Sequence, residues 1–208
     1  MFIATFDMGT RNFAFCVERR DSTKRKKGIK PTFDAEGNPT DEYREQLEQV
    51  YQDGRLIECQ RIDLVEYGKQ QQIGNIYLTL TRVLDMFTPL WDVVDVILIE
   101  QQMAYGRNKA NIQALRLAQH CLSYFYTVYG SFKTIQEWSS THKTRMLGCP
   151  HSGRRTHRER KQFSVNLATR ILRERKDPLL DVFYSLSKQD DVSDCVLMAQ
   201  TFAVKQLS

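Results

Sequence analysis

The sequence lacks the long apolar run that a membrane-spanning helix needs. No stretch reaches the roughly eighteen consecutive apolar residues of such a span, and no basic leader followed by an apolar region opens the chain. The five cysteines are odd in number and form no CxxC pair, which argues against a disulfide framework and favours reduced thiols. We therefore expect a soluble intracellular protein in a reducing compartment, without a membrane partner.

The sequence also lacks a complete set of zinc ligands and a large net charge. Cys149, His151 and His157 lie close together, but a fourth ligand at regular spacing is missing, so the sequence argues against structural zinc. The net charge is only +5 over 208 residues, and 41% of the residues are hydrophobic. This composition predicts one globular domain across residues 1–208 with a sizeable core.

A charged insertion at about residues 19–54 interrupts this domain. Its first part, residues 19–30, is strongly basic, whereas its second part, residues 34–53, is strongly acidic. Opposite blocks of this kind predict a mobile or self-compensating loop, with a short helix at 41–50. We interpret the basic block first as a solvated loop, and a DNA contact is the alternative.

Hydrophobic patterns along the rest of the chain predict strands followed by helices. Expected strands cover residues 2–7, 13–17, 56–65, 93–99 and 132–138, and expected helices cover 69–87, 108–129, 158–175 and 190–206, with a polar loop at 139–157. Core packing explains most of the broad apolar stripe at 112–125, and a dimer seam could account for its excess. The order predicts an α/β, ribonuclease H-like fold, with a mixed five-stranded sheet, antiparallel leading strands and helices on both faces.

Acidic residues stand where hydrophobic runs meet polar breaks. Asp7 ends the first strand, Glu100 ends the fourth, and Asp191 and Asp194 open the last helix on one shared face. Each one alone could be a local cap, but converging carboxylates would repel one another unless divalent cations lay between them. The helix dipole should keep Asp191 and Asp194 ionised, whereas Asp190 points about 100° away from Asp191 and suits a cap.

Basic residues cluster near the expected acidic site and favour contacts with nucleic-acid phosphates. A solvated surface is the alternative interpretation of the cluster. The start of the 108–129 helix could bind a further phosphate through Arg107 and Lys109. The candidate DNA-binding residues are Arg107, Lys109, Lys143, Arg145, Arg154, Arg155, Arg158, Arg160 and Lys161.

Three motifs give the sequence a specific resemblance. FDMG at residues 6–9, LIEQQ at 98–102 and KQDDVSD at 188–194 resemble the RuvC superfamily of Holliday junction resolvases, and the doubled aspartate is typical of its poxvirus-type and fungal mitochondrial branch. The resemblance implies a homodimeric endonuclease that depends on Mg²⁺ or Mn²⁺, with two ions per subunit, and nicks opposing strands of a four-way DNA junction. It implies that Asp7, Glu100, Asp191 and Asp194 are the metal ligands and that Lys143 is a catalytic basic residue.

Two other functions are compatible with the same sequence. A ribonuclease H-like enzyme that cuts the RNA of an RNA–DNA hybrid would use a similar carboxylate set, and a non-catalytic junction-binding protein would need only the basic surface. The poxvirus-type resemblance also suggests a large DNA virus as the source, with recombination or replication of its genome as the role. The location would then be the host cytoplasm or nucleus.

Overall fold

One mixed sheet forms the centre of the molecule. The computed structural model describes residues 1–21, 29–35, 38–102, 111–149 and 157–207. In this part of the chain the sheet has five strands in the order β3-β2-β1-β4-β5, in which β1, β2 and β3 are antiparallel and β1, β4 and β5 are parallel. The strands are β1 (Phe2–Asp7), β2 (Phe13–Arg20), β3 (Gly54–Ile62), β4 (Val96–Gln101) and β5 (Thr134–Ser139). The expected α/β architecture is therefore confirmed.

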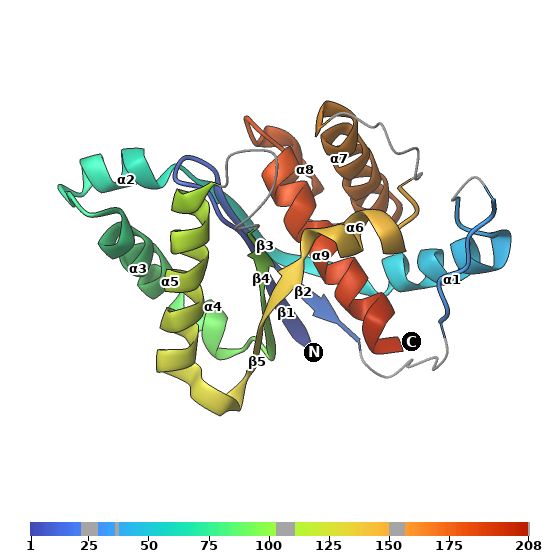
Figure 1. Ribbon diagram of the computed structural model, residues 1–208, viewed down its shortest axis with the longest axis horizontal. Helices are drawn as coiled ribbons and strands as arrows, with labels where there is room; N and C mark the ends of the chain where they lie inside the picture. The colour runs from blue at the N-terminus through green and yellow to red at the C-terminus, as the bar shows by residue number, and fades with distance from the viewer. Residues whose placement is uncertain (22–28, 36–37, 103–110, 150–156, 208) are drawn as a thin grey trace.

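The register of the two central parallel strands places the expected acidic residues side by side. Phe6 of β1 pairs with Ile99 of β4. Asp7 and Glu100 are the next residues of these strands, so both leave the sheet at the same edge. In Figure 1 this is the upper edge, towards which β1 runs from the N-terminus.

Helices cover both faces of the sheet (Figure 1). On one face lie α2 (Leu64–Gln70), α3 (Ile76–Met86), α4 (Thr88–Asp92) and α5 (Ile112–Tyr129), followed by the short 3₁₀ helix η2 (Gly130–Phe132). On the other face lie α1 (Asp41–Gln52), α6 (Ser140–Met146), α7 (His157–Glu174), α8 (Leu180–Ser185) and α9 (Asp190–Leu207). Among the described residues, none of these helices combines the length and the apolarity that crossing a bilayer requires.

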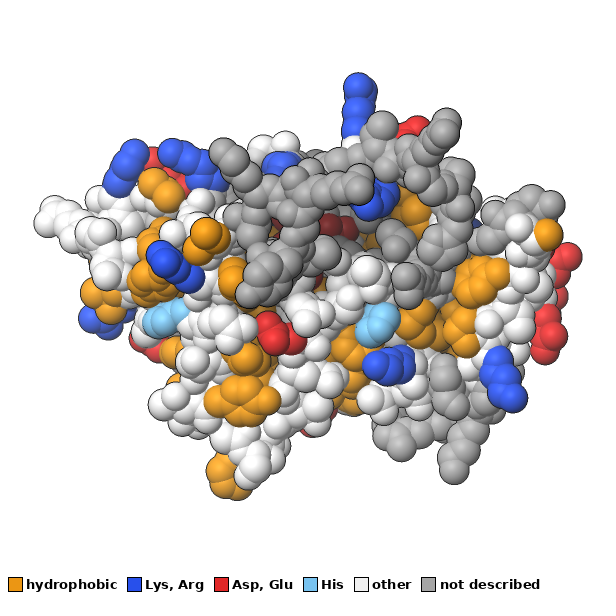
Figure 2. Space-filling view, in the orientation of Figure 1, with side chains coloured by type: hydrophobic (Ala, Val, Ile, Leu, Met, Phe, Trp, Pro, Cys, Tyr) orange, Lys and Arg blue, Asp and Glu red, His pale blue; other side chains and the backbone are white. Residues whose placement is uncertain are grey.

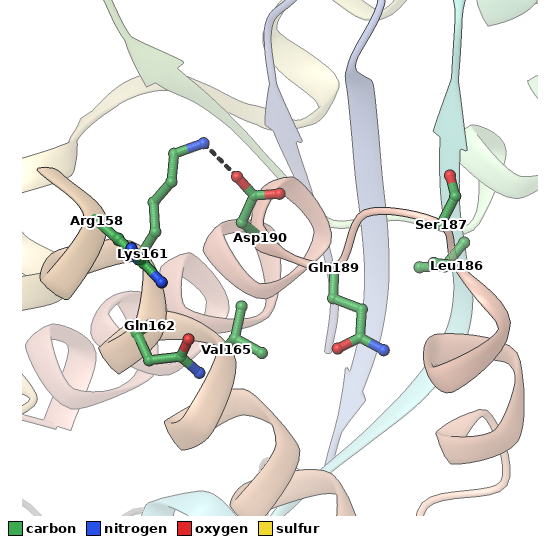
Figure 3. A pocket seen from close by; sticks show the side chains of 8 residues that line it. All are labelled: Arg158, Lys161, Gln162, Val165, Leu186, Ser187, Gln189 and Asp190. Atoms are coloured by element: carbon green, nitrogen blue, oxygen red, sulfur yellow. Dashed lines mark hydrogen bonds and ion pairs between the residues drawn. The ribbon is translucent and has the colours of Figure 1, made fainter.

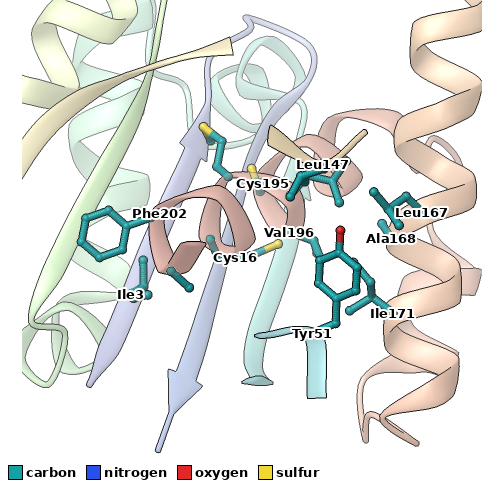
Figure 4. Close-up of a cluster of buried hydrophobic side chains, with 14 of the residues drawn as sticks. Ile3, Cys16, Tyr51, Leu147, Leu167, Ala168, Ile171, Cys195, Val196 and Phe202 are labelled. Carbon is teal, nitrogen blue, oxygen red and sulfur yellow. The ribbon is translucent and has the colours of Figure 1, made fainter. Parts of the chain in front are cut away.

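Alternation along the central strands creates one core on each side of the sheet. Ile3 and Leu98 face α9, α7 and α1, in the cluster shown in Figure 4. Ala4 and Phe6 face α3, α4 and α5, where Phe6 packs against a ring of buried aromatic side chains. All five cysteines are buried thiols that form no disulfide with one another, as the sequence predicts.

A buried ionic network joins β2 to α9 and to Arg175, the residue that follows α7. Glu18 contacts Arg20 at 2.6 Å and Arg175 at 2.8 Å, and Gln200 of α9 donates to Glu18 at 2.8 Å. Burial alone would raise the pKa of Glu18, but the two guanidinium groups hold it below its ordinary value. The expectation that the basic block is solvated from its first residues is therefore wrong for Arg20, which is 4% exposed.

One part of the insertion agrees with the sequence-based expectation, and two other segments differ from it. Residues 41–52 form α1, which confirms the short helix expected at 41–50, and its buried Tyr43, Leu47 and Val50 fix it to the core. The expected helix at 69–87 is broken, because Gln72 adopts a positive φ of 54° and Asn75 caps the start of α3. The expected loop at 139–157 begins instead with α6, which the Ser139 side chain caps.

Candidate metal centre and nucleic-acid interface

Asp7 and Glu100 are the two predicted metal ligands that contact each other. Burial raises the pKa of Asp7 well above its ordinary value of 3.8, and the adjacent Glu100 carboxylate raises it further through charge repulsion and a hydrogen bond. Asp194 contributes a smaller repulsion in the same direction. The structure therefore brings Asp7 and Glu100 into contact, with Asp194 near enough to act on the charge of Asp7.

Contacts between α9 and the sheet fix the position of Asp194. The Thr5 hydroxyl of β1 donates to the backbone carbonyl of Cys195 at 3.0 Å, and the Cys195 thiol donates to the carbonyl of Ala14 in β2 at 3.6 Å. Thr5 and Cys195 are fully buried. Because both contacts involve the residue that follows Asp194, they hold the first turns of α9 against the end of β1.

Asp191 is held by two basic side chains of the protein. The Lys188 ammonium donates to both of its carboxylate oxygens, at 3.1 and 2.8 Å, and Arg61 Nε lies 3.8 Å from one of them. Burial nevertheless raises the pKa of Asp191, and the opposing effect of Lys188 does not cancel it. Desolvation, which helix position alone does not reveal, is thus the largest influence on the pKa of Asp191.

The neighbouring Asp190 faces a different partner. Burial would raise its pKa, but Lys161 of α7 binds its carboxylate and Lys188 lies 3.4 Å away, and together they hold the pKa below its ordinary value. Lys161 is engaged in this ion pair and is only partly exposed. A contact between Lys161 and DNA would therefore require Lys161 to leave Asp190.

Arg61 is a residue near the site that sequence reasoning missed. Its guanidinium donates to the carbonyl of Arg11 at 3.1 Å, to Asn12 Oδ1 at 2.6 Å and to the Ser187 hydroxyl at 3.3 Å. It therefore connects the β1–β2 turn with the segment that precedes α9. Arg61 lies in β3, where the sequence alone gives no signal that its side chain reaches Asp191.

The carboxylate groups of the predicted metal ligands suit a hard divalent cation, although their side chains do not form a complete coordination site. Within the ranges that the structure describes, no group of three or more His, Cys, Asp or Glu side chains is arranged to hold a metal ion. The chemistry of the set fits nonetheless, since Asp7 and Glu100 are like-charged oxygen donors in contact, a situation that a cation relieves. Asp191 would join such a site after release by Lys188.

A groove lies beside Asp190 at the start of α9 (Figure 3). It has a volume of about 540 Å³ and runs between α7 and the segment that leads into α9. Its lining residues are Arg158, Lys161, Gln162, Val165, Leu186, Ser187, Gln189 and Asp190. The groove therefore combines cationic, acidic, amide and apolar groups between α7 and the start of α9.

Only part of the predicted DNA-binding surface is described. Arg158 and Arg160 are exposed at the start of α7. Figure 2 shows several Lys and Arg side chains projecting along the upper edge of the molecule, the edge at which β1 ends. Lys143 and Arg145 lie on α6, but their side chains fall outside the described structure. Arg107, Lys109, Arg154 and Arg155 also lie outside the described residues.

Comparison with solved structures identifies the class of fold. The chain has the RuvC-like resolvase fold, within the ribonuclease H-like class. Fowlpox virus resolvase, solved with substrate Holliday junction DNA, superposes with a TM-score of 0.59 at 15% identity and with 100% of both chains covered. RuvC of Thermus thermophilus superposes with a TM-score of 0.54 at 13% identity, covering 100% of this chain and 98% of RuvC. The expected resemblance, including its poxvirus-type branch, is confirmed as a fold.

The sequence relatives are viral proteins. Uncharacterized protein 97L of Invertebrate iridescent virus 3 is 27% identical over 212 residues, which cover 96% of this chain and 98% of the relative. Uncharacterized protein 170L of Invertebrate iridescent virus 6 is 25% identical over 238 residues, which cover 97% of this chain and 88% of the relative. No protein-family model matches the chain.

Proposed function

We propose that this protein is a divalent-metal-dependent endonuclease that resolves four-way DNA junctions. The observation that carries the proposal is the contact between Asp7 and Glu100 at the ends of adjacent parallel strands, with Asp194 close by. This arrangement occurs on a fold shared with the fowlpox virus and Thermus thermophilus resolvases, both of which were solved with Holliday junction DNA. Like-charged oxygen donors at such an edge suit Mg²⁺ or Mn²⁺.

The proposed roles follow from the positions of the side chains. Asp7, Glu100 and Asp194, with Asp191 after its release, would hold the ions. Bound divalent ions activate water as a nucleophile and stabilise the charge on the leaving oxygen of a phosphodiester. The remaining task of the protein is to place the scissile phosphate at this edge, for which the cations around the groove provide the means.

Basic residues on α7 would position the DNA. Arg158 and Arg160 are exposed in the first turn of the helix, where they are free of burial and accessible to a DNA backbone. Contacts of this kind fix the register of a duplex without selecting its sequence. Lys143 remains a proposed catalytic residue, because α6 follows β5 directly at the same edge of the sheet.

We further propose that the active form is a homodimer. A four-way junction has two opposing strands to cut, and a two-fold dimer presents one site to each strand. The α5 side of the molecule offers apolar surface for such an interface, since Ile112 and Tyr126 are 56% and 51% exposed. Sedimentation equilibrium should therefore report a dimer, and a monomer at all concentrations would remove this part of the proposal.

A cleavage assay with matched substrates tests the activity. The purified protein is incubated in Mg²⁺ or Mn²⁺ with a synthetic four-way junction, a linear duplex of the same sequence and an RNA–DNA hybrid. We expect paired nicks in the junction and little cleavage of the other substrates. Preferential cleavage of the hybrid would favour a ribonuclease H-like activity, whereas tight junction binding without cleavage would favour a non-catalytic protein.

A further inference from the structure

Lys188 occupies the carboxylate oxygens that the proposed function assigns to a metal ion. Its ammonium lies within hydrogen-bond distance of both oxygens of Asp191, and it lies 3.4 Å from Asp190. The lysine sits three residues before Asp191, in the segment between α8 and α9. One cationic side chain thus serves two adjacent carboxylates, one of which is a proposed metal ligand.

A divalent cation and the Lys188 ammonium cannot share these positions without cost. Two positive charges a few ångströms apart repel, and the repulsion is strengthened where water is partly excluded. The Asp191 side chain is only 11% exposed, so screening there is limited. The Lys188 side chain is 35% exposed and flexible, so it has a route to solvent when a stronger cation arrives.

Arg61, the other basic residue beside Asp191, differs from Lys188 because its side chain is fixed in place. Its guanidinium is fixed by contacts to Arg11, Asn12 and Ser187, and its buried Nε has no hydrogen-bond partner among the described residues while it faces Asp191 across 3.8 Å. These contacts would keep Arg61 in place during a change at Asp191. Arg61 therefore supplies a permanent positive charge, whereas Lys188 supplies an exchangeable one.

We propose that Lys188 is an internal counter-ion of Asp191 that a divalent cation displaces. Lys188 holds the Asp191 carboxylate and compensates its charge. A divalent cation bound by Asp191 would take the place of the ammonium, which would then move to solvent. The inference rests on the proposed role of Asp191 as a metal ligand. It makes Lys188 a positioning residue that lowers the affinity of the site for metal.

The test measures metal affinity in the absence of DNA, with Mn²⁺ as the probe and electron paramagnetic resonance or titration calorimetry as the readout. Lys188→Gln should bind Mn²⁺ about tenfold more tightly than the wild type, because the competing cation is gone. Lys188→Arg keeps the charge and should not show this gain. Lys188→Met provides a second neutral variant if the glutamine variant folds poorly, which circular dichroism would reveal.

A matched control removes the same charge elsewhere. Lys69 also pairs with a carboxylate three residues away, Glu66, but lies on α2 and is exposed. Lys69→Gln should leave the Mn²⁺ affinity unchanged, and the gain from Lys188→Gln should vanish in a background that also carries Asp191→Asn. Unchanged or weaker Mn²⁺ binding by Lys188→Gln, or a gain that persists without Asp191, would overturn the inference.

The result is separable from the test of the proposed function. If the wild type cuts four-way junctions but Lys188→Gln binds Mn²⁺ no better than the wild type, only the displacement of Lys188 is wrong. If Lys188→Gln gains affinity through Asp191 while no substrate is cut, the counter-ion role stands and the endonuclease assignment fails.

Discussion

Replacing Asp7 with asparagine is expected to stabilise the metal-free protein while it abolishes cleavage. Asp7 is half-buried beside Glu100, and the wild type must either ionise two neighbouring carboxylates or keep a proton on one of them. Asparagine has nearly the same shape, carries no charge and can donate a hydrogen bond to Glu100. The substitution therefore removes a repulsion that only a bound cation would otherwise relieve.

The size of the effect follows from the geometry and from partial screening. Two unit charges about 4 Å apart cost about 4 kcal/mol at an effective dielectric constant near 20. The site opens to solvent at the edge of the sheet, and the wild type can retain a proton, so we expect a gain of about 1–3 kcal/mol in the free energy of unfolding at neutral pH. For a domain of this size, the gain corresponds to a rise in Tm of roughly 3 to 9 °C.

The dependence on pH has a definite sign. Because the folded pKa of Asp7 lies above its ordinary value of 3.8, the wild type carries no penalty below that value, and the penalty grows as pH rises from 3.8 towards the raised pKa. The gain in unfolding free energy from Asp7→Asn should therefore be absent in acid. It should grow as pH rises from 3.8 towards the raised pKa of Asp7, and it should stay constant at higher pH. Added Mg²⁺ should then stabilise the wild type more than the variant.

Urea unfolding in EDTA across a pH series measures the effect directly. Asp41→Asn is the control, because the Asp41 side chain is 95% exposed on α1 and its replacement should change stability by at most about 0.5 kcal/mol. A variant at Asp7 that is less stable than the wild type in EDTA at neutral pH would refute the reasoning. So would an advantage that does not change with pH.

Two further predictions concern the fold and the DNA surface. Gly54→Ala should destabilise the protein by about 2–4 kcal/mol in thermal or urea unfolding. A Cβ there would lie 2.5 Å from Glu18 and 2.6 Å from Arg175 in the buried network. A variant as stable as the wild type would show that these side chains move aside at no cost. Arg158→Gln and Arg160→Gln should each weaken junction binding and reduce the slope of log affinity against log salt by about 1, as measured by fluorescence anisotropy. An unchanged slope in both variants would remove these residues from the interface.

The sequence was informative where the order of elements pointed to a known layout. The juxtaposition of Asp7 and Glu100 follows from the parallel pairing of β1 with β4, which the ribonuclease H-like order of strands and helices led us to expect. The start of α9 at Asp190 also agrees with the pattern of apolar residues. The fold and the placement of the acidic edge could therefore be predicted before the structure was known.

Contacts between distant segments could not be predicted in the same way. Arg61 and Asp191 are far apart in sequence, and only the closure of the segment before α9 onto β3 brings them together. The burial of Arg20 likewise depends on Glu18 and on Arg175 beyond the end of α7, although local composition suggested a solvated basic block. The upward shift in the pKa of Asp191 could not be predicted for the same reason, because desolvation arises from tertiary packing rather than from helix position.

The central claim is that this acidic edge cuts four-way junctions, and a supercoiled plasmid that extrudes a cruciform tests it most directly. Paired nicks across the junction convert the plasmid to a linear molecule, whereas a single nick relaxes it and the cruciform is lost. The account predicts a linear product with the wild type in Mg²⁺ or Mn²⁺, and none with Asp7→Asn or in EDTA. A plasmid that stays supercoiled with the wild type, or cleavage that survives Asp7→Asn, would contradict the account.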